Sequence, residues 1–151
     1  YDIIGADLVR REDENGLRQS QAAIEALIAR EKARGIPVNR IVLAGFSQGC
    51  AMALMTGLRH PEALAGIVGL SGYLPLADMT AAERHPANAA TRVFMAHGSL
   101  DEVVPLARAS ASRDLLADLG YTVDWHDYPM PHSVCQEEIV DLNRWLLEVL
   151  A

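Results

Sequence analysis

The chain has 151 residues, of which 50% are hydrophobic and 22% charged, and its formal net charge is −7. This composition fits a single domain, residues 1–151, with a sizeable apolar core, and it excludes a disordered chain. The acidic balance also argues against nucleic acid as a partner, because nucleic-acid-binding domains carry a basic surface.

The first part of the chain alternates helix and strand signals. From Leu17 to Arg34 apolar residues recur at helical spacing, and Gly35 and Pro37 end the pattern. The continuous apolar run Ile41 to Ala44 predicts a strand covered on both faces. Ser47 to Arg59, rich in Ala, Met and Leu, predicts the helix that follows it.

The same alternation continues to the end of the chain. Three further strands are predicted, over Ala65 to Leu70, Arg92 to Ala96 and Thr122 to His126, and two further helices, over Pro105 to Leu119 and Gln136 to Leu150. Such alternation predicts an α/β fold with a mostly parallel sheet and helices on both faces. Functional side chains should then follow the carboxyl ends of the strands.

The segment from Ser71 to Thr91 is too long for an ordinary connection between two elements. We expect it to be irregular and to cap part of a binding cleft. Leu74 and Pro75, near its start, are the residues expected to contact a substrate.

The sequence Gly45-Phe46-Ser47-Gln48-Gly49 fits the pattern G-x-S-x-G and lies between a predicted strand and a predicted helix. In that context the serine projects from a sharp turn as a nucleophile, and flanking glycines allow strand and helix to approach closely. The alternative is a serine that only caps the helix. A similar stretch around Ser71 lacks the final glycine, so we interpret Ser71 as a strand-end residue.

A serine nucleophile needs a histidine base and a carboxylate that orients it, in the chain order serine, acid, histidine. Asp101 follows the strand that ends near Ala96, and Glu102 is its nearest rival. His132 lies in the loop after the last predicted strand and is the expected base. The other histidines lie at helix ends, in irregular sequence or at strand ends, where a packed structural role fits better; they are His60, His85, His97 and His126.

The tetrahedral intermediate of such a reaction needs hydrogen-bond donors for its oxyanion. The backbone N–H of Gln48, next to the nucleophile, is expected to supply one of them. The second normally comes from a glycine-containing loop after an earlier strand, and no such loop precedes Leu17. Its absence would cost about 100- to 1,000-fold in rate.

Cys50 and Cys135 show neither metal-ligand spacing nor a disulfide framework, which suits a reducing compartment and predicts a cytoplasmic protein. We interpret both as small buried residues rather than nucleophiles. No apolar run is long enough to cross a bilayer, and the N-terminus has no signal-peptide pattern.

These residues together resemble the phospholipase/carboxylesterase family of α/β-hydrolases, which includes bacterial carboxylesterases and acyl-protein thioesterases. The resemblance covers nearly the whole chain, and the motifs that carry it are Tyr1-Asp2-Ile3, Arg40 to Cys50, Leu70 to Pro75, Gly98 with Asp101 to Pro105, and Tyr128 to His132. It implies an α/β-hydrolase fold and a Ser47, Asp101 and His132 triad. It also implies small ester or thioester substrates, no metal or organic cofactor, and the dimers common among its members.

The sequence departs from the family pattern in three ways. Cys50 stands where a second glycine is common, and Pro131 stands where glycine commonly precedes the histidine, so the His132 loop is expected to sit differently. The opening strands and their oxyanion loop have no counterpart. The strand at Ile41 to Phe46, expected centrally in the complete sheet, would then lose a neighbour and expose an apolar edge, which predicts instability or aggregation.

Three functions fit these observations. The first is a serine hydrolase that cleaves carboxylic esters or thioesters through an acyl-enzyme. The second is a non-catalytic fragment that binds acyl groups, which the missing oxyanion loop favours. The third is another α/β-hydrolase reaction, such as lactone or peptide-bond hydrolysis, which the same triad supports.

Overall fold

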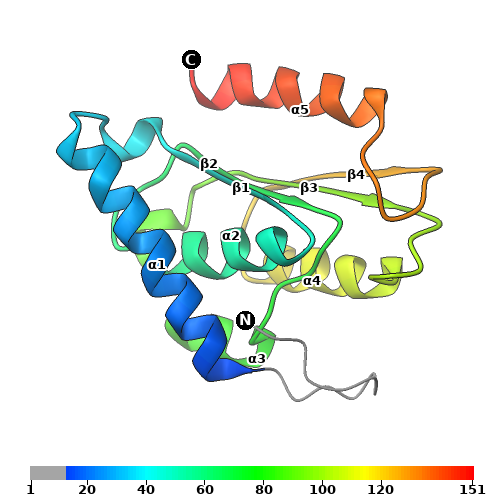
Figure 1. Ribbon diagram of the computed structural model, residues 1–151, viewed down its shortest axis with the longest axis horizontal. Helices are drawn as coiled ribbons and strands as arrows, with labels where there is room; N and C mark the ends of the chain where they lie inside the picture. The colour runs from blue at the N-terminus through cyan, green and yellow to red at the C-terminus, as the bar shows by residue number, and fades with distance from the viewer. Residues whose placement is uncertain (1–12) are drawn as a thin grey trace.

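The computed structural model describes residues 13–151, which form a four-stranded parallel sheet with helices around it (Figure 1). In chain order the helices and strands are α1 (Glu14–Ala33), β1 (Val42–Phe46), α2 (Gln48–Arg59), β2 (Gly66–Leu70), α3 (Ala77–Glu83), β3 (Val93–Gly98), α4 (Leu106–Asp118), β4 (Val123–Tyr128) and α5 (Gln136–Val149). Short 3-10 helices at Val38–Arg40 and Pro86–Asn88 precede β1 and β3. The segment Tyr1-Asp2-Ile3 lies outside the described residues.

The predicted α/β architecture is confirmed, with small shifts at the ends of elements. Helix α1 begins at Glu14, before the predicted Leu17, because the Asp13 side chain caps it by accepting a hydrogen bond of 2.9 Å from the backbone N–H of Gly16. Strands β3 and β4 continue past their predicted ends to Gly98 and Tyr128, and these extra residues pair with each other across the sheet.

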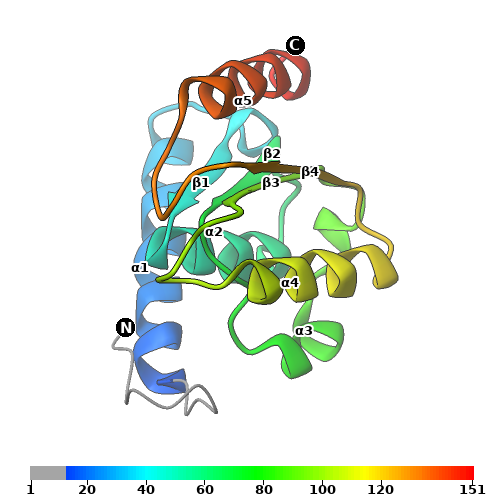
Figure 2. The same ribbon diagram turned by 90° about the vertical axis from the view of Figure 1, so that its right-hand side faces the viewer.

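Helices cover both faces of the sheet, as predicted. Figure 2 shows α5 on one face and α2 and α4 on the other. The core under α2 and α4 includes Leu54, Ile67 and Met95, whereas the core under α5 is built around Phe94 and Trp145. Burial on both faces explains why the central strands β2 and β3 have nearly continuous apolar sequences.

The four strands lie in the order β1-β2-β3-β4, so within the described residues β1 forms one edge of the sheet and pairs only with β2. Ala44 and Phe46 of this strand are exposed. An apolar groove of about 350 Å³ runs between β1, α1 and α2, lined in part by Leu27, Val42 and Met52. The apolar edge expected from the sequence is therefore present in this part of the chain. None of the helices between residues 13 and 151 has the length and hydropathy to cross a membrane.

The segment from Ser71 to Thr91 was expected to be irregular, and this expectation is wrong in part because it contains α3. Leu76 turns the chain into this helix with a left-handed φ of 48°. Seven residues are too few for a helix to be stable by itself, so tertiary contacts must hold α3 in place.

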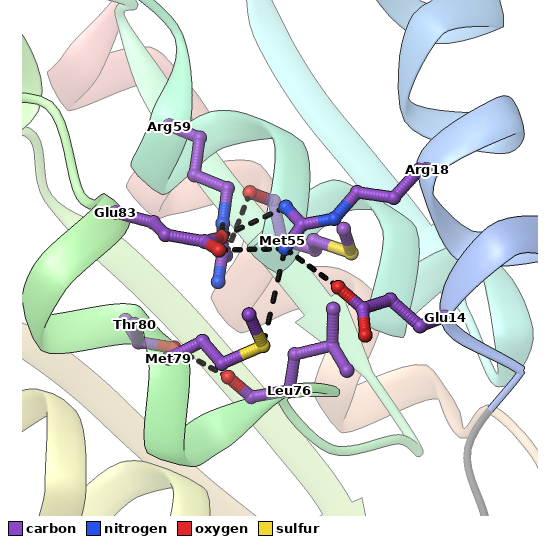
Figure 3. Close-up of polar contacts among 8 residues, drawn as sticks. All are labelled: Glu14, Arg18, Met55, Arg59, Leu76, Met79, Thr80 and Glu83. Carbon is purple, nitrogen blue, oxygen red and sulfur yellow. Dashed lines mark hydrogen bonds and ion pairs between the residues drawn. The ribbon is translucent and has the colours of Figure 1, made fainter.

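An ion-pair cluster provides these contacts, and Figure 3 shows two guanidinium groups converging on the Glu83 carboxylate at the end of α3. Arg18 of α1 donates to Glu83 at 2.6 and 2.8 Å, and Arg59 of α2 donates from Nε at 2.7 Å. The Arg59 side chain is only 4% exposed. The cluster thus joins α3 to two longer helices.

Hydrogen bonding to Arg18, with a smaller contribution from Arg59, lowers the pKa of Glu83 to about 2 from its usual 4.5. Because the pKa is lower in the folded chain, the stabilisation is complete above pH 4.5 and is lost as the pH falls towards 2. We expect Glu83→Gln to lower the free energy of unfolding by about 2 kcal/mol at pH 7, since it removes the charge between two arginines.

Urea titrations at pH 7 and pH 3 would measure this effect. The difference between Glu83→Gln and the unmodified chain should shrink at pH 3. Glu62→Gln is the matched control, because Glu62 pairs with Lys32 at an exposed site, where solvent screens the ion pair and its loss should cost much less than that of Glu83. Equal losses for Glu83→Gln at the two pH values would contradict the assignment.

Candidate active site

The predicted catalytic residues lie at one edge of the sheet, where the parallel strands end. Ser47 directly follows β1, Asp101 follows β3 in the loop before α4, and His132 follows β4 in the loop before α5. Since the strands are parallel, their carboxyl ends meet on the same side of the molecule.

Ser47 occupies a strained turn between β1 and α2, with φ 57° and ψ −114°. Positive φ is costly for a residue with a side chain, so the surrounding contacts must hold it. The backbone N–H of Ser47 donates to the carbonyl of Leu70 at 2.8 Å, and the Ser47 carbonyl accepts from Ala51 at 3.3 Å. This is the geometry expected of a nucleophile elbow, and Gln48 follows as the first residue of α2.

The two glycines of the motif differ in what they contact. A Cβ at Gly45 would lie 2.0 Å from the carbonyl carbon and oxygen of Gly49, so the close approach of strand and helix requires glycine there. A Cβ at Gly49 would meet nothing within 4 Å among the described residues. The sequence-based reason for glycine therefore applies to Gly45 and is not supported at Gly49.

The structure brings Ser47, His132 and Asp101 into one chain of hydrogen bonds. Nδ1 of His132 lies 2.7 Å from Oδ2 of Asp101, and Nε2 lies 3.1 Å from Oγ of Ser47. Because the ionised carboxylate can only accept, Nδ1 carries the ring proton and Nε2 is left to accept from the serine hydroxyl. This tautomer is the one a general base needs.

Asp101 is held rigidly, and its side chain is fully buried. Its Oδ1 accepts from the backbone N–H groups of Val103 and Val104, both at 2.8 Å. Burial by itself would raise the pKa of Asp101, but the hydrogen bonds from His132, Val104 and Val103 outweigh it and hold that pKa below its usual range. The carboxylate therefore stays ionised beside the histidine.

His97 is a neighbour of this site whose position the sequence did not predict. Its side chain is buried, as expected of a packed histidine, and its Nε2 donates to the Val104 carbonyl at 2.7 Å. The same nitrogen lies 3.4 Å from Oδ2 of Asp101. His97 thus connects the loop that carries Asp101 to the end of β3. The only signal for this role in the sequence is that His97 lies at the end of the predicted strand that Asp101 follows.

The remaining histidines have partners elsewhere. His60 pairs with Glu25 at 2.6 Å, and His85 accepts from the backbone of Ala87. His126 stacks on Phe94 with ring centroids 5.0 Å apart.

The rival residues also lie outside the hydrogen-bonded chain. Glu102 is exposed, and Asp101 takes the contact with His132. Ser71 is fully buried with φ 52°, and its hydroxyl lies 3.5 Å from the Ser133 carbonyl.

Cys50 is a buried residue of α2 that faces β2, where its Sγ would be 2.8 Å from a Cβ added at Gly69. Burial raises the pKa of its thiol to about 12, so it stays protonated, which suits the structural role expected for it. Cys135 is partly buried and directly precedes α5. Neither sulfur takes part in the contacts around Ser47.

Pro131 also departs from the family pattern, which commonly has glycine before the histidine. With Pro131 in place, the His132 loop still contacts the end of β3. The carbonyl preceding it, that of Met130, accepts from the backbone N–H of Leu100 at 3.1 Å. Gly98 is needed below this loop, because a Cβ there would lie 2.3 Å from the carbonyls of Met130 and Pro131. A proline before His132 is thus compatible with the 2.7 Å contact to Asp101.

Leu74 and Pro75, the expected substrate contacts, are both buried. The Leu74 backbone N–H donates to Oγ of Ser112 at 2.9 Å. Leu74 lines a cavity between α3 and α4 that Ser47 and His132 do not line, and Pro75 does not line it either. Among residues 13–151, no group of three or more His, Cys, Asp or Glu side chains is placed to hold a metal ion.

Comparison with known proteins gives a consistent result. A family model described as Phospholipase/Carboxylesterase matches residues 1–150. An acyl-protein thioesterase 1 of Yarrowia lipolytica is 42% identical over 152 residues, covering 98% of this chain and 67% of that protein. An acyl-protein thioesterase 1 of Neurospora crassa is 45% identical over 159 residues, covering 99% of this chain and 64% of that protein. The chain therefore spans about two thirds of the length of these relatives.

Solved structures share the fold. The crystal structure of Zea mays acyl-protein thioesterase 2 superimposes with a TM-score of 0.87 at 26% identity, covering 100% of this chain and 72% of that one. The Bacillus cereus carboxylesterase has a TM-score of 0.83 at 20% identity, covering 99% of this chain and 68% of that one.

Proposed function

This chain belongs to the phospholipase/carboxylesterase family, and from that membership we propose that it cleaves carboxylic esters or thioesters with Ser47 as nucleophile, His132 as general base and Asp101 as the orienting acid. The observation that carries the proposal is the continuous hydrogen-bond chain from Ser47 through His132 to Asp101. The names of the curated relatives favour acyl thioesters among the substrates.

In the proposed reaction, Oγ of Ser47 attacks the carbonyl carbon while Nε2 of His132 takes the hydroxyl proton. The carbonyl oxygen becomes an oxyanion, and in the proposal the backbone N–H of Gln48, the first residue of α2, donates a hydrogen bond to it. Collapse of the tetrahedral intermediate expels the alcohol or thiol, which receives the proton from His132. Water activated by the same histidine then hydrolyses the acyl-serine and releases the carboxylic acid.

The contacts of Asp101 explain how His132 can act as the general base. Asp101 stabilises the imidazolium that forms during attack, and its own low pKa keeps it from taking the proton. Phe46 packs against the His132 ring with centroids 4.9 Å apart and so restricts its rotation. The free thiols of Cys50 and Cys135 agree with a cytoplasmic setting, which is part of the proposal, as is a homodimer.

Labelling by a fluorophosphonate tests the proposal without requiring turnover, because the probe reacts with an activated serine. We expect the unmodified chain to be labelled at Ser47 and Ser47→Ala to lose both labelling and ester cleavage. Ser71→Ala is the matched control, since Ser71 also has positive φ at a strand end but no histidine partner; it should still be labelled at Ser47.

Labelling that persists in Ser47→Ala would refute the assignment. A chain that binds acyl ligands but neither reacts with the probe nor releases product would instead be the non-catalytic acyl-binding fragment.

A further inference from the structure

A cavity of about 390 Å³ lies between α3 and α4, at a place that the proposed reaction does not use. Its walls are mainly apolar, from Leu74, Leu76, Met79 and Leu115. Among residues 13–151, Arg108 of α4 is the one basic residue that lines it. This combination of an apolar chamber and a single cation is typical of a site for an amphipathic anion.

The Arg108 guanidinium stacks on an aromatic ring, and among residues 13–151 it has no hydrogen-bond acceptor for one of its nitrogens. Its central carbon lies 3.6 Å from the ring centroid of Tyr73, so it stacks closely on that ring. One of its terminal nitrogens, Nη1, is buried without a hydrogen-bond partner. Among residues 13–151 no carboxylate lies within the 4.0 Å of an ion pair with it. Arg108 as a whole is partly buried, but its buried and unpaired Nη1 is costly, so this nitrogen would gain from an anionic acceptor.

The other described arginines that stack on aromatic rings each have a hydrogen-bond acceptor as well. Arg113 lies over Trp125 at 4.6 Å and pairs with Asp114. Arg92 lies over Trp145 and pairs with Asp124 and Glu148, and Arg84 lies over Tyr121 and donates to the Leu119 carbonyl. At these three sites the stacked guanidinium group also has an acceptor. At Arg108 one nitrogen of the stacked guanidinium group, Nη1, has none within the described part of the chain.

The other polar groups of the cavity do not take this role. The Ser112 hydroxyl accepts from the Leu74 backbone and donates to the Arg108 carbonyl. Asp78 is exposed at the rim, and it lies beyond ion-pair distance of Arg108. The cluster around Glu83 anchors α3, the helix that carries Met79, so this wall of the cavity is held in place (Figure 3).

We propose that this cavity binds a carboxylate carried on an alkyl chain, with the carboxylate on Arg108 and the chain against the leucine and methionine side chains. A guanidinium matches the two oxygens of a carboxylate, and the apolar walls exclude water from the contact. The proposal does not rest on Ser47 acting as a nucleophile, so Ser47→Ala should bind the ligand as the unmodified chain does.

Isothermal titration calorimetry with octanoate and with octan-1-ol tests this proposal on the full 151-residue chain. We expect octanoate to bind at least about ten-fold more tightly than the alcohol, the preference that a charge-assisted hydrogen bond provides. Arg108→Met, which keeps the length of the side chain but not its charge, should remove that preference. Arg113→Met, on the same helix and also stacked on a ring, should change octanoate binding less than about two-fold.

A second variant guards against a misfolded Arg108→Met. Ala111 is an exposed residue of α4 that lines the cavity, so Ala111→Leu should narrow the cavity and weaken octanoate and octanol together. No octanoate binding by the unmodified chain, or equal octanoate affinity in folded Arg108→Met, would overturn the proposal. Loss of binding in Ser47→Ala would place the ligand at the proposed active site instead.

Discussion

Asp101→Asn should lower the rate of ester hydrolysis by about 10⁴-fold while the chain stays folded. The asparagine amide can donate to Nδ1 of His132, which would move the ring proton to Nε2. A protonated Nε2 cannot accept from the Ser47 hydroxyl, so the base is lost although the side chains remain in place. The rates of p-nitrophenyl butyrate hydrolysis and of fluorophosphonate labelling both measure this effect.

Glu102→Gln is the control for this substitution. It changes the neighbouring carboxylate, which is exposed and lies outside the hydrogen-bonded chain. We expect both rates to stay within about two-fold of those of the unmodified chain, since an exposed surface substitution has little effect on structure. A large loss in Glu102→Gln together with a small loss in Asp101→Asn would reverse the assignment of the acid.

Gly45→Ala should destabilise the chain by about 3 kcal/mol or more, because the new Cβ would overlap backbone atoms that cannot move aside without separating β1 from α2. The contact concerned is the 2.0 Å distance to the Gly49 carbonyl carbon and oxygen. Labelling of Ser47 should fall as well, since the turn that holds the serine depends on this approach. Urea unfolding followed by circular dichroism measures the stability.

Gly49→Ala provides the matched control within the same five residues. Its Cβ meets no described atom within 4 Å, and alanine is the better helix former at this position in α2. Its stability should therefore stay within about 1 kcal/mol of the unmodified chain. If both alanine variants lose the same stability, close packing of strand and helix is not the reason for the glycine.

Much of the fold could be predicted because its signals are local. The apolar run from Ala65 to Leu70 marks a strand buried on both faces, and β2 indeed lies inside a sheet with helices on both sides, whereas β1, at the edge of the described sheet, is partly exposed. Helix α3 was missed because its seven residues are held by Glu83, whose partners Arg18 and Arg59 are far away in the sequence. No local sequence pattern predicts a short helix that is held by contacts with distant residues.

For the candidate site, the sequence by itself identified Ser47 as the candidate nucleophile. The residues that form its turn are consecutive, from Gly45 to Gly49, so the motif can be recognised without the structure. It also restricted the acid and the base to a few residues after the strands. Only the tertiary structure decided that Asp101, rather than Glu102, meets His132, because that contact depends on how the ends of β3 and β4 are brought together. The stacking of Arg108 on Tyr73 and the cavity beside it, between α3 and α4, likewise appear only in the tertiary structure. Hydrogen bonds between residues far apart in the chain depend on how the folded structure brings them together, and the spacing of residues in the sequence does not predict this.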